Sequence, residues 1–293
     1  MATEGRGPTS RLPQRLACVG DNCVDYYRPP IDRCFAAGNA LNVAVALARG
    51  GHRVDYFGAV GDDAAGSEIV DVLRGQGVGV DHVRRGPGPT SLTEIALERG
   101  ERRFSSFAEG AAERYAPSAA DLAELGGRRL VHVAGLEGEA ALLAALAGNG
   151  ALLSGDLDDR RTLSLAARLS VAFFSATADE SLDQAADLAR AAAAGGAGTA
   201  VVMCGARGSL GCRGGRLVAL PAEDIEPVDT CGAGDSYIAA FLDTHLQGAG
   251  LEACMRAGSR AATATCLSVG ASPGGGDALS VTRPDTTEAE EVP

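Results

Sequence analysis

The chain of 293 residues carries 26 basic and 38 acidic side chains, so its formal net charge is −12 at pH 7. With this acidic balance and no long basic stretch, we expect no nucleic-acid partner. The sequence contains no Lys, which excludes enzymes that use a lysine Schiff base or a Walker-type phosphate-binding lysine. Its 46% hydrophobic and 22% charged residues are typical of a globular protein.

The eight cysteines include no C-x-x-C pair and have no His at zinc-site spacing, so we expect no structural metal. The N-terminus does not resemble a signal peptide, and no apolar run reaches the roughly 18 residues of a membrane span. We therefore expect a cytoplasmic protein with reduced thiols and no membrane partner.

In chain order, residues 1–13 and 277–293 lack apolar periodicity and are predicted to be disordered tails. Between them, over 14–276, short apolar runs alternate with longer Ala/Leu-rich segments. This order predicts a mostly parallel sheet with helices on both faces. The expected strands lie in 16–27, 54–60, 129–135, 151–156, 171–174 and 199–204, and the expected helices in 39–51, 64–77, 139–147, 161–169 and 179–194.

One segment breaks this alternation. Residues 91–98 and 102–110 alternate apolar and polar side chains around a turn at Arg99, Gly100 and Glu101, which is typical of a β-hairpin. With the strand near residues 24–27, it predicts a small β lid from strands at about 23–36 and 90–108. The alternative is a hairpin that has no contact with ligand.

The most informative motif is DTCGAGDSYIAAFL at 229–242. Gly232 and Gly234 let backbone N–H groups converge at the start of an apolar helix, and this arrangement favours a phosphate. Asp235 would repel such an anion unless it accepts a proton from a nucleophile that attacks the phosphate. The motif thus predicts a base for phosphoryl transfer, whereas the alternative for Asp235 is a simple helix cap.

Two motifs carry a family resemblance. DTCGAGDSYIAAFL resembles the second signature of the PfkB/ribokinase family of carbohydrate kinases, and AGNALNVAVALA at 37–48 resembles the first. The resemblance implies a ribokinase-like three-layer α/β/α fold, with a mostly parallel central sheet and a small β lid. It also implies ATP-dependent phosphorylation of a primary sugar hydroxyl with Mg²⁺, and it allows for a homodimer through the lid.

The resemblance also implies roles for individual residues. Asp235 stands where the family has its catalytic base. The residues whose N–H groups would hold charge on the phosphoryl group are Gly232, Ala233 and Gly234, and those at substrate-binding positions are Asp25, Gly38, Asn39, Asn42 and Glu109. Taken singly, the alternative for Asp25 is an exposed strand acid, and the alternative for Asn42 is a residue at the start of a helix.

The residues expected to contact the nucleotide are Gly205, Gly208, Thr230, Gly232 and Gly234. Residues 263–270 are expected to form one side of the adenine site. Many relatives place an Asn-x-x-Glu motif after the strand that corresponds to 171–174, where it orders magnesium-bound water. This sequence instead has SATADE at 175–180, which makes Glu180 the candidate. Some relatives have a monovalent-cation site near the counterparts of Asp229, Cys231 and Gly270. Whether this chain has one is left open, because Cys231 stands where several relatives carry Thr.

Other features resemble the family members that phosphorylate the 6-hydroxyl of fructosamines such as fructoselysine. They are GDNCVDYY at 20–27, AGNALNVAV at 37–45, FAEG at 107–110 and FFSA at 173–176. A glycated amino acid is both cationic and anionic, so Glu109 is expected to face its ammonium. Candidates for its carboxylate are Arg28, Arg33, Arg102 and Arg103, of which Arg102 and Arg103 point to opposite faces of a strand.

The alternatives are a ribokinase, a fructokinase or a nucleoside kinase of the same fold, and a non-catalytic sugar- or nucleotide-binding sensor. A dinucleotide-dependent oxidoreductase ranks last, because no G-x-G-x-x-G follows an early strand.

Overall fold

The computed structural model describes residues 13–157, 160–283 and 290–291. Apart from residue 13, the tail expected at 1–13 lies outside the described residues. A central sheet has the strand order β13-β12-β11-β10-β9-β8-β1-β4-β5, and the neighbouring strands from β5 to β11 are parallel. The strands are β1 (Arg15–Gly20), β4 (Arg53–Gly61), β5 (Gly79–Gly86), β8 (Leu130–Ala134), β9 (Leu152–Leu157), β10 (Val171–Ser175), β11 (Ala200–Met203), β12 (Ser209–Arg213) and β13 (Arg216–Leu220).

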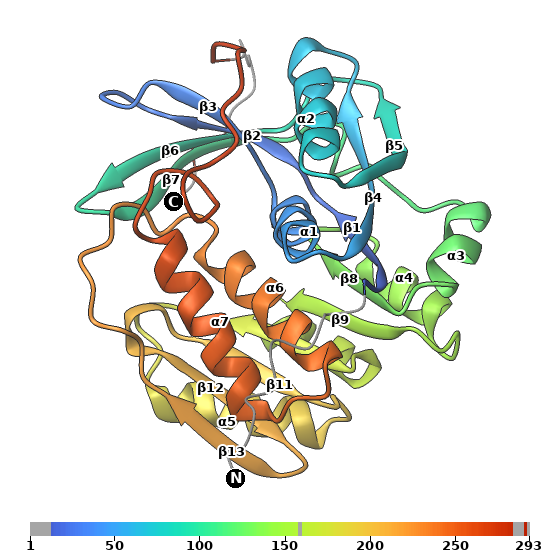
Figure 1. The fold of residues 1–293 in the computed structure, drawn as a ribbon, viewed down its shortest axis with the longest axis vertical. Coiled ribbons are helices and arrows are strands. Elements are labelled where there is room, and N and C mark those ends of the chain that lie inside the picture. Colours follow the sequence, from blue (N-terminus) through green and yellow to red (C-terminus); the bar gives the residue numbers. More distant parts are fainter. Residues whose placement is uncertain (1–12, 158–159, 284–289, 292–293) are drawn as a thin grey trace, which may run out of the picture.

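Helices cover both faces of this sheet (Figure 1). The α-helices are α1 (Asn39–Arg49), α2 (Ala64–Gly75), α3 (Ala119–Gly126), α4 (Glu139–Leu146), α5 (Leu182–Ala194), α6 (Ala233–Leu246) and α7 (Leu251–Thr265). Two 3₁₀ helices span Arg160–Arg168 and Gly205–Arg207.

Strand β1 shows why the architecture has three layers. Leu16 and Cys18 pack into a core formed with α1, α2, α6 and α7, whereas Ala17 and Val19 pack into a second core with α3, α4 and α5. All four side chains are fully buried. Because successive side chains of a strand point to opposite faces, a strand that is apolar at every position must be covered on both sides. The predicted α/β/α fold is confirmed.

A smaller sheet has the order β14-β7-β6-β2-β3 and forms a separate layer at the upper left of Figure 1. Its strands are β2 (Cys23–Tyr27), β3 (Arg33–Ala37), β6 (Leu92–Glu98), β7 (Glu101–Ala108) and β14 (Glu290–Glu291). The expected hairpin is present as the antiparallel β6–β7 pair, and β2 joins β6 in parallel. Only two residues separate β1 from β2, so the chain passes directly from the central sheet into the small one.

The C-terminal segment 277–283 differs from the prediction of a disordered tail, which is wrong for these residues. The Leu279 N–H donates to the Cys34 carbonyl over 2.9 Å, and Arg49 pairs with Asp277 over 3.2 Å. The segment binds the backbone groups that the edge strand β3 leaves unpaired. Composition does not reveal such pairing, since Cys34 and Leu279 are 245 residues apart in sequence.

The rest of the expected C-terminal tail, at 284–289 and 292–293, lies outside the described residues, and the backbone of β14 pairs with β7. All eight cysteines are free thiols, and six of them are buried, as expected for small core residues. Within the described parts of the chain, no helix has both the length and the apolar character needed to cross a membrane.

Candidate active site

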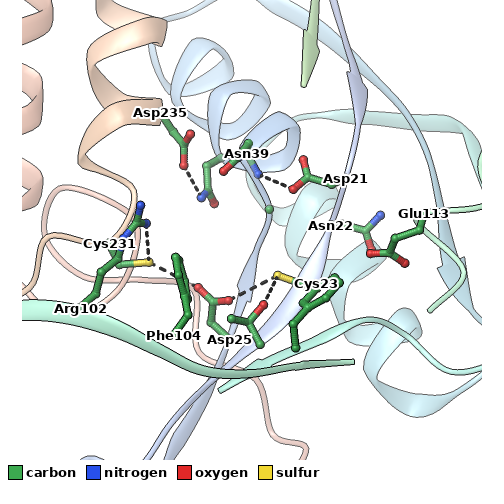
Figure 2. Close-up of a pocket in the computed structure, with 14 residues that line it drawn as sticks. Asp21, Asn22, Cys23, Asp25, Asn39, Arg102, Phe104, Glu113, Cys231 and Asp235 are labelled. Atoms are coloured by element: carbon green, nitrogen blue, oxygen red, sulfur yellow. Dashed lines mark hydrogen bonds between the residues drawn. The ribbon is translucent and has the colours of Figure 1, made fainter. Parts of the chain in front are cut away.

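A pocket of about 260 Å³ opens where β1, α1 and α6 meet the small sheet (Figure 2). It lies at the carboxyl end of β1, the usual position of ligand sites in parallel sheets. Its volume is slightly below the roughly 300–1,000 Å³ of drug-sized ligand sites, so it suits a monosaccharide. The lining residues are Asp21, Asn22, Cys23, Asp25, Gly38, Asn39, Asn42, Thr93, Arg102, Phe104, Phe107, Glu113, Cys231 and Asp235.

The loop before α6 has the shape that the glycine motif predicts. Gly232 precedes the helix with a φ of 68°, in the left-handed region, and no side chain caps the helix. A Cβ on Gly232 would lie 2.5 Å from the Cα of Ala271, so only glycine fits. The first N–H groups of α6 therefore have no side-chain cap, and they carry the positive end of the helix dipole.

Asp235 is not the helix cap, which contradicts the simpler interpretation of this residue. Its carboxylate is buried and accepts a hydrogen bond of 2.8 Å from the side-chain amide of Asn42 in α1. Burial raises the pKa of Asp235 to about 6, although the Asn42 hydrogen bond and the charge of Arg102 oppose this shift. The two signature motifs thus meet at one carboxylate, 193 residues apart in sequence.

Asp25 also lines the pocket, as expected. Its two carboxylate oxygens accept hydrogen bonds of 3.4 Å from the thiols of Cys23 and Cys231. Burial raises its pKa to about 6, and these thiol hydrogen bonds act against that shift. Thiols are weak donors, so Asp25 keeps the capacity to accept stronger hydrogen bonds.

Asp21 is a lining residue that the sequence reasoning missed. Its carboxylate accepts from the backbone N–H groups of Asn39 and Ala40, at 3.1 and 2.9 Å, and so holds the first turn of α1. Burial raises its pKa to about 7, and these hydrogen bonds oppose the shift. Its position directly after the first buried strand was the available signal.

Gly38 lies at the start of α1 with a φ of 125°, where a Cβ would be 2.5 Å from the Cα of Asn22. Glycine therefore brings this backbone close to the pocket. Together with Asn39 and Asn42, it places three of the expected substrate-binding positions on one pocket wall.

The hairpin contributes one arginine to the pocket. Arg102 lines it, with its guanidinium 3.8 Å from the thiol of Cys231, while Arg103 lies on the opposite face and pairs with Glu98. The alternation expected along this strand is confirmed. Arg28 and Arg33 are exposed and do not line the pocket.

The expectation for Glu109 is wrong: Glu109 is exposed and does not line the pocket, whereas Glu113 does. Strand β7 ends at Ala108, and the N–H of Gly110 then donates to the Glu113 carboxylate over 2.7 Å. Strand alternation would place Glu109 at the pocket. Because the strand has ended, the turn instead brings Glu113, four residues later, to the pocket. No local sequence pattern signals such a return.

The family profile described as "pfkB family carbohydrate kinase" matches residues 16–275. The chain belongs to the pfkB family of carbohydrate kinases. It is therefore an ATP-dependent sugar kinase, a phosphotransferase that acts on a sugar hydroxyl. The oxidoreductase alternative is wrong.

The kinase is 35% identical over 255 residues to fructoselysine 6-kinase of Shigella flexneri, covering 85% of this chain and 96% of that protein. It is 31% identical over 264 residues to a fructosamine kinase of Bacillus subtilis, covering 88% and 92%. Among solved structures, Arabidopsis thaliana ribokinase complexed with ribose and ATP has a TM-score of 0.77 at 23% identity, covering 91% and 96%. This likeness shows the ribokinase-like fold.

In the kinase, Asp229 is fully buried at the start of the glycine motif. Its carboxylate accepts from the Tyr27 hydroxyl (2.6 Å) and from the N–H groups of Gly270 (2.8 Å) and Cys231 (2.9 Å). The three residues expected around a monovalent cation are therefore adjacent. Asp229 uses its oxygens to join strand β2 to the loop before α6.

Thr230, expected on the nucleotide side, contacts the hairpin. Its N–H donates to the Gly100 carbonyl over 3.1 Å, and its hydroxyl accepts from the Arg102 N–H over 3.3 Å. The hairpin tip is thus bonded to the loop that precedes α6.

The other nucleotide-side candidates lie at the carboxyl ends of β10 and β11. Gly205 has open space where a Cβ would stand, whereas a Cβ on Gly208 would lie 2.0 Å from the Leu220 carbonyl, so Gly208 is required by packing. Glu180 lies outside the pocket and accepts from the N–H of Thr177 over 3.1 Å. Within the described residues, no group of three His, Cys, Asp or Glu side chains could hold a metal ion.

Gly232 and Gly234 differ in the space available for a side chain, so we expect alanine to destabilise the protein at Gly232 but not at Gly234. Gly232→Ala forces a side chain into a left-handed backbone and against Ala271, so we expect a loss of about 2 kcal/mol or more. Gly234→Ala is the matched control, because its Cβ would meet only Met203, at 3.7 Å. Thermal unfolding should show a lower Tm for Gly232→Ala alone, and equal Tm values would contradict the packing argument.

Proposed function

We propose that this kinase transfers the γ-phosphoryl group of ATP to the 6-hydroxyl of a fructosamine such as fructoselysine. The observation that carries the kinase chemistry is the buried Asp235 carboxylate, oriented by Asn42 at the uncapped start of α6 and inside a sugar-sized pocket. The substrate class is supported by the fructoselysine 6-kinase and the fructosamine kinase to which the chain is similar over most of its length.

In the proposed reaction, Asp235 is the general base. It takes the proton of the sugar hydroxyl as that oxygen bonds to the γ-phosphorus, while the bond from phosphorus to the β–γ bridging oxygen breaks and ADP leaves. Asn42 donates to one carboxylate oxygen and leaves the other to receive the proton. The N–H groups of Gly232, Ala233 and Gly234, with the α6 dipole, would stabilise the phosphoryl charge.

Arg102 supplies positive charge at the same end of the pocket. It is the only cationic residue among the fourteen that line the pocket, and its charge lowers the pKa of both Asp235 and Asp25. We assign it to the transferring phosphoryl group rather than to the carboxylate of a glycated amino acid. Because Arg102 belongs to the hairpin, a lid closed over the sugar would complete the site and exclude water.

The sugar would bind along the wall formed by Asp25, Gly38, Asn39 and Asn42. Carboxylates accept two hydroxyl hydrogens, amides both donate and accept, and Gly38 permits close approach of the backbone. Asp21 supports this wall by fixing the first turn of α1.

The nucleotide phosphates would lie between the loop at Thr230, Gly232 and Gly234 and the turn at Gly205, which Gly208 shapes. Mg²⁺, when bound with the nucleotide, would neutralise phosphate charge. The Glu180 carboxylate, an oxygen ligand of the kind that Mg²⁺ prefers, would hold it through water. A monovalent cation beside Asp229 would have to displace existing hydrogen bonds, so no step is assigned to one.

The substrate proposal is tested by ADP release over a panel of sugars. We expect kcat/KM for fructoselysine to exceed that for fructose, ribose or a nucleoside by at least about 100-fold, an effect of about 2.7 kcal/mol. A preference for one of those other acceptors would assign the enzyme to the corresponding fructokinase, ribokinase or nucleoside kinase activity. Nucleotide binding without turnover on any acceptor would support a sensor.

Asp235→Asn should fold and bind ATP but lose about 10²- to 10⁴-fold in kcat, because the amide keeps the shape and cannot take the proton. Asp243→Asn, about two turns further along α6 and outside the pocket, is the matched control. Near-normal turnover by Asp235→Asn would contradict the assignment of the base.

The raised pKa of Asp235 predicts a pH dependence. The base acts only when ionised, so kcat/KM should fall as pH drops through about 6, rather than near the ordinary value of 3.8. Since the Asn42 hydrogen bond favours the ionised form, Asn42→Leu should move this midpoint to higher pH. A pH–rate profile of both enzymes measures the shift, and a midpoint near 4 would contradict the prediction.

A further inference from the structure

The pocket has two chemically different ends. Asp235 and Arg102 lie together at one end, next to the start of α6, whereas Asn22 and Glu113 lie at the opposite end (Figure 2). The proposed phosphoryl transfer occupies the Asp235 end. A substrate whose 6-hydroxyl meets Asp235 would therefore direct the other end of its carbon chain, C1, toward Glu113.

Glu113 is fixed in place but has an unused oxygen. Its Oε2 accepts two hydrogen bonds, from the Ser91 hydroxyl over 2.8 Å and from the Gly110 N–H over 2.7 Å. Over the part of the chain that the structure describes, its Oε1 accepts no hydrogen bond and its charge has no ion-pair partner. The side chain is half-buried, so it presents an oriented, uncompensated carboxylate to the pocket.

Asn22 lines the same end of the pocket (Figure 2). The residue is only 1% exposed, and its amide N–H₂ donates to the Tyr56 hydroxyl (3.0 Å) and to the Ala59 carbonyl (2.7 Å). Its Oδ1 finds no donor among the described residues. A buried acceptor without a donor is costly, but this oxygen is itself enclosed, so recognition of a ligand at this end depends on Glu113.

The charge of the whole pocket points the same way. Four carboxylates line it, those of Asp21, Asp25, Glu113 and Asp235, against the single guanidinium of Arg102. Both oxygens of Asp21 accept from backbone N–H groups and both oxygens of Asp25 accept from thiols, whereas Glu113, like Asp235, keeps one oxygen without a hydrogen bond. A cation bound at the Glu113 end would relieve this excess of negative charge.

We propose that Glu113 is a specificity-determining residue that binds a protonated nitrogen attached to C1 of the sugar. This inference rests on the proposed fructosamine substrate. The nitrogen that joins fructose to an amino acid is an alkylamine, protonated at neutral pH, and it carries two N–H groups. Free fructose has a neutral hydroxyl at that place, with one hydrogen to donate. Glu113 therefore distinguishes the glycated substrate from the plain sugar by charge.

Glu113→Gln tests this role in the full-length enzyme. Glutamine keeps an oxygen for Ser91 and Gly110 but removes the charge. We expect kcat/KM for fructoselysine to fall about 10- to 100-fold, mainly through KM, with the value for fructose changed less than about 2-fold. Glu109→Gln, the same substitution on the exposed acid four residues earlier, should leave both values unchanged.

A second measurement needs no mutation. The unmodified enzyme should use an ether isostere, with oxygen in place of the linking nitrogen, about 10- to 100-fold less well than fructoselysine. This comparison applies even when the Glu113→Gln protein does not fold.

The outcomes separate the two proposals. Equal losses for fructoselysine and fructose in Glu113→Gln, or equal use of the amine and the ether, would show that Glu113 only braces the loop and would overturn this inference. The fructosamine proposal would stand as long as the unmodified enzyme prefers fructoselysine to fructose. Without that preference, both proposals would fail.

Discussion

The hydrogen bond from Asn42 to the buried carboxylate of Asp235 is the contact on which the rest of the site depends. It links α1 and α6, which come from opposite ends of the chain but pack on the same face of the central sheet. Because both side chains are held by buried helices, the carboxylate has a fixed orientation before any ligand binds. Preorganisation of this kind lowers the cost of reaching the transition state.

Burial sets the pKa values of the aspartates that line the pocket. Burial is the largest cause of the raised pKa of Asp21, Asp25 and Asp235. The charge of Asp235 adds to the raised pKa of Asp21, and the charge of Asp25 adds to that of Asp235. Arg102 opposes the shifts at Asp25 and Asp235, so the position of the hairpin affects the strength of the base.

The small sheet is joined by hydrogen bonds to the loop that precedes α6. Thr230 bonds to Gly100 at the hairpin tip, and the Asp229 carboxylate accepts from Tyr27 in β2. The same sheet is held at its outer edge by segment 277–283, which pairs with β3 and contacts α1 through Arg49. These contacts connect the small sheet both to the loop that precedes α6 and to α1.

The sequence by itself determined the alternating α/β order, the hairpin and the position of Asp235, because these depend on local periodicity, turn residues and a contiguous motif. It also limited Arg102 and Arg103 to one ligand contact, since strand alternation is a local rule. Only the tertiary structure decided that Glu113 rather than Glu109 reaches the pocket, and that 277–283 pairs with an edge strand. Both depend on where the chain returns after leaving regular structure, and contacts between distant segments set that path.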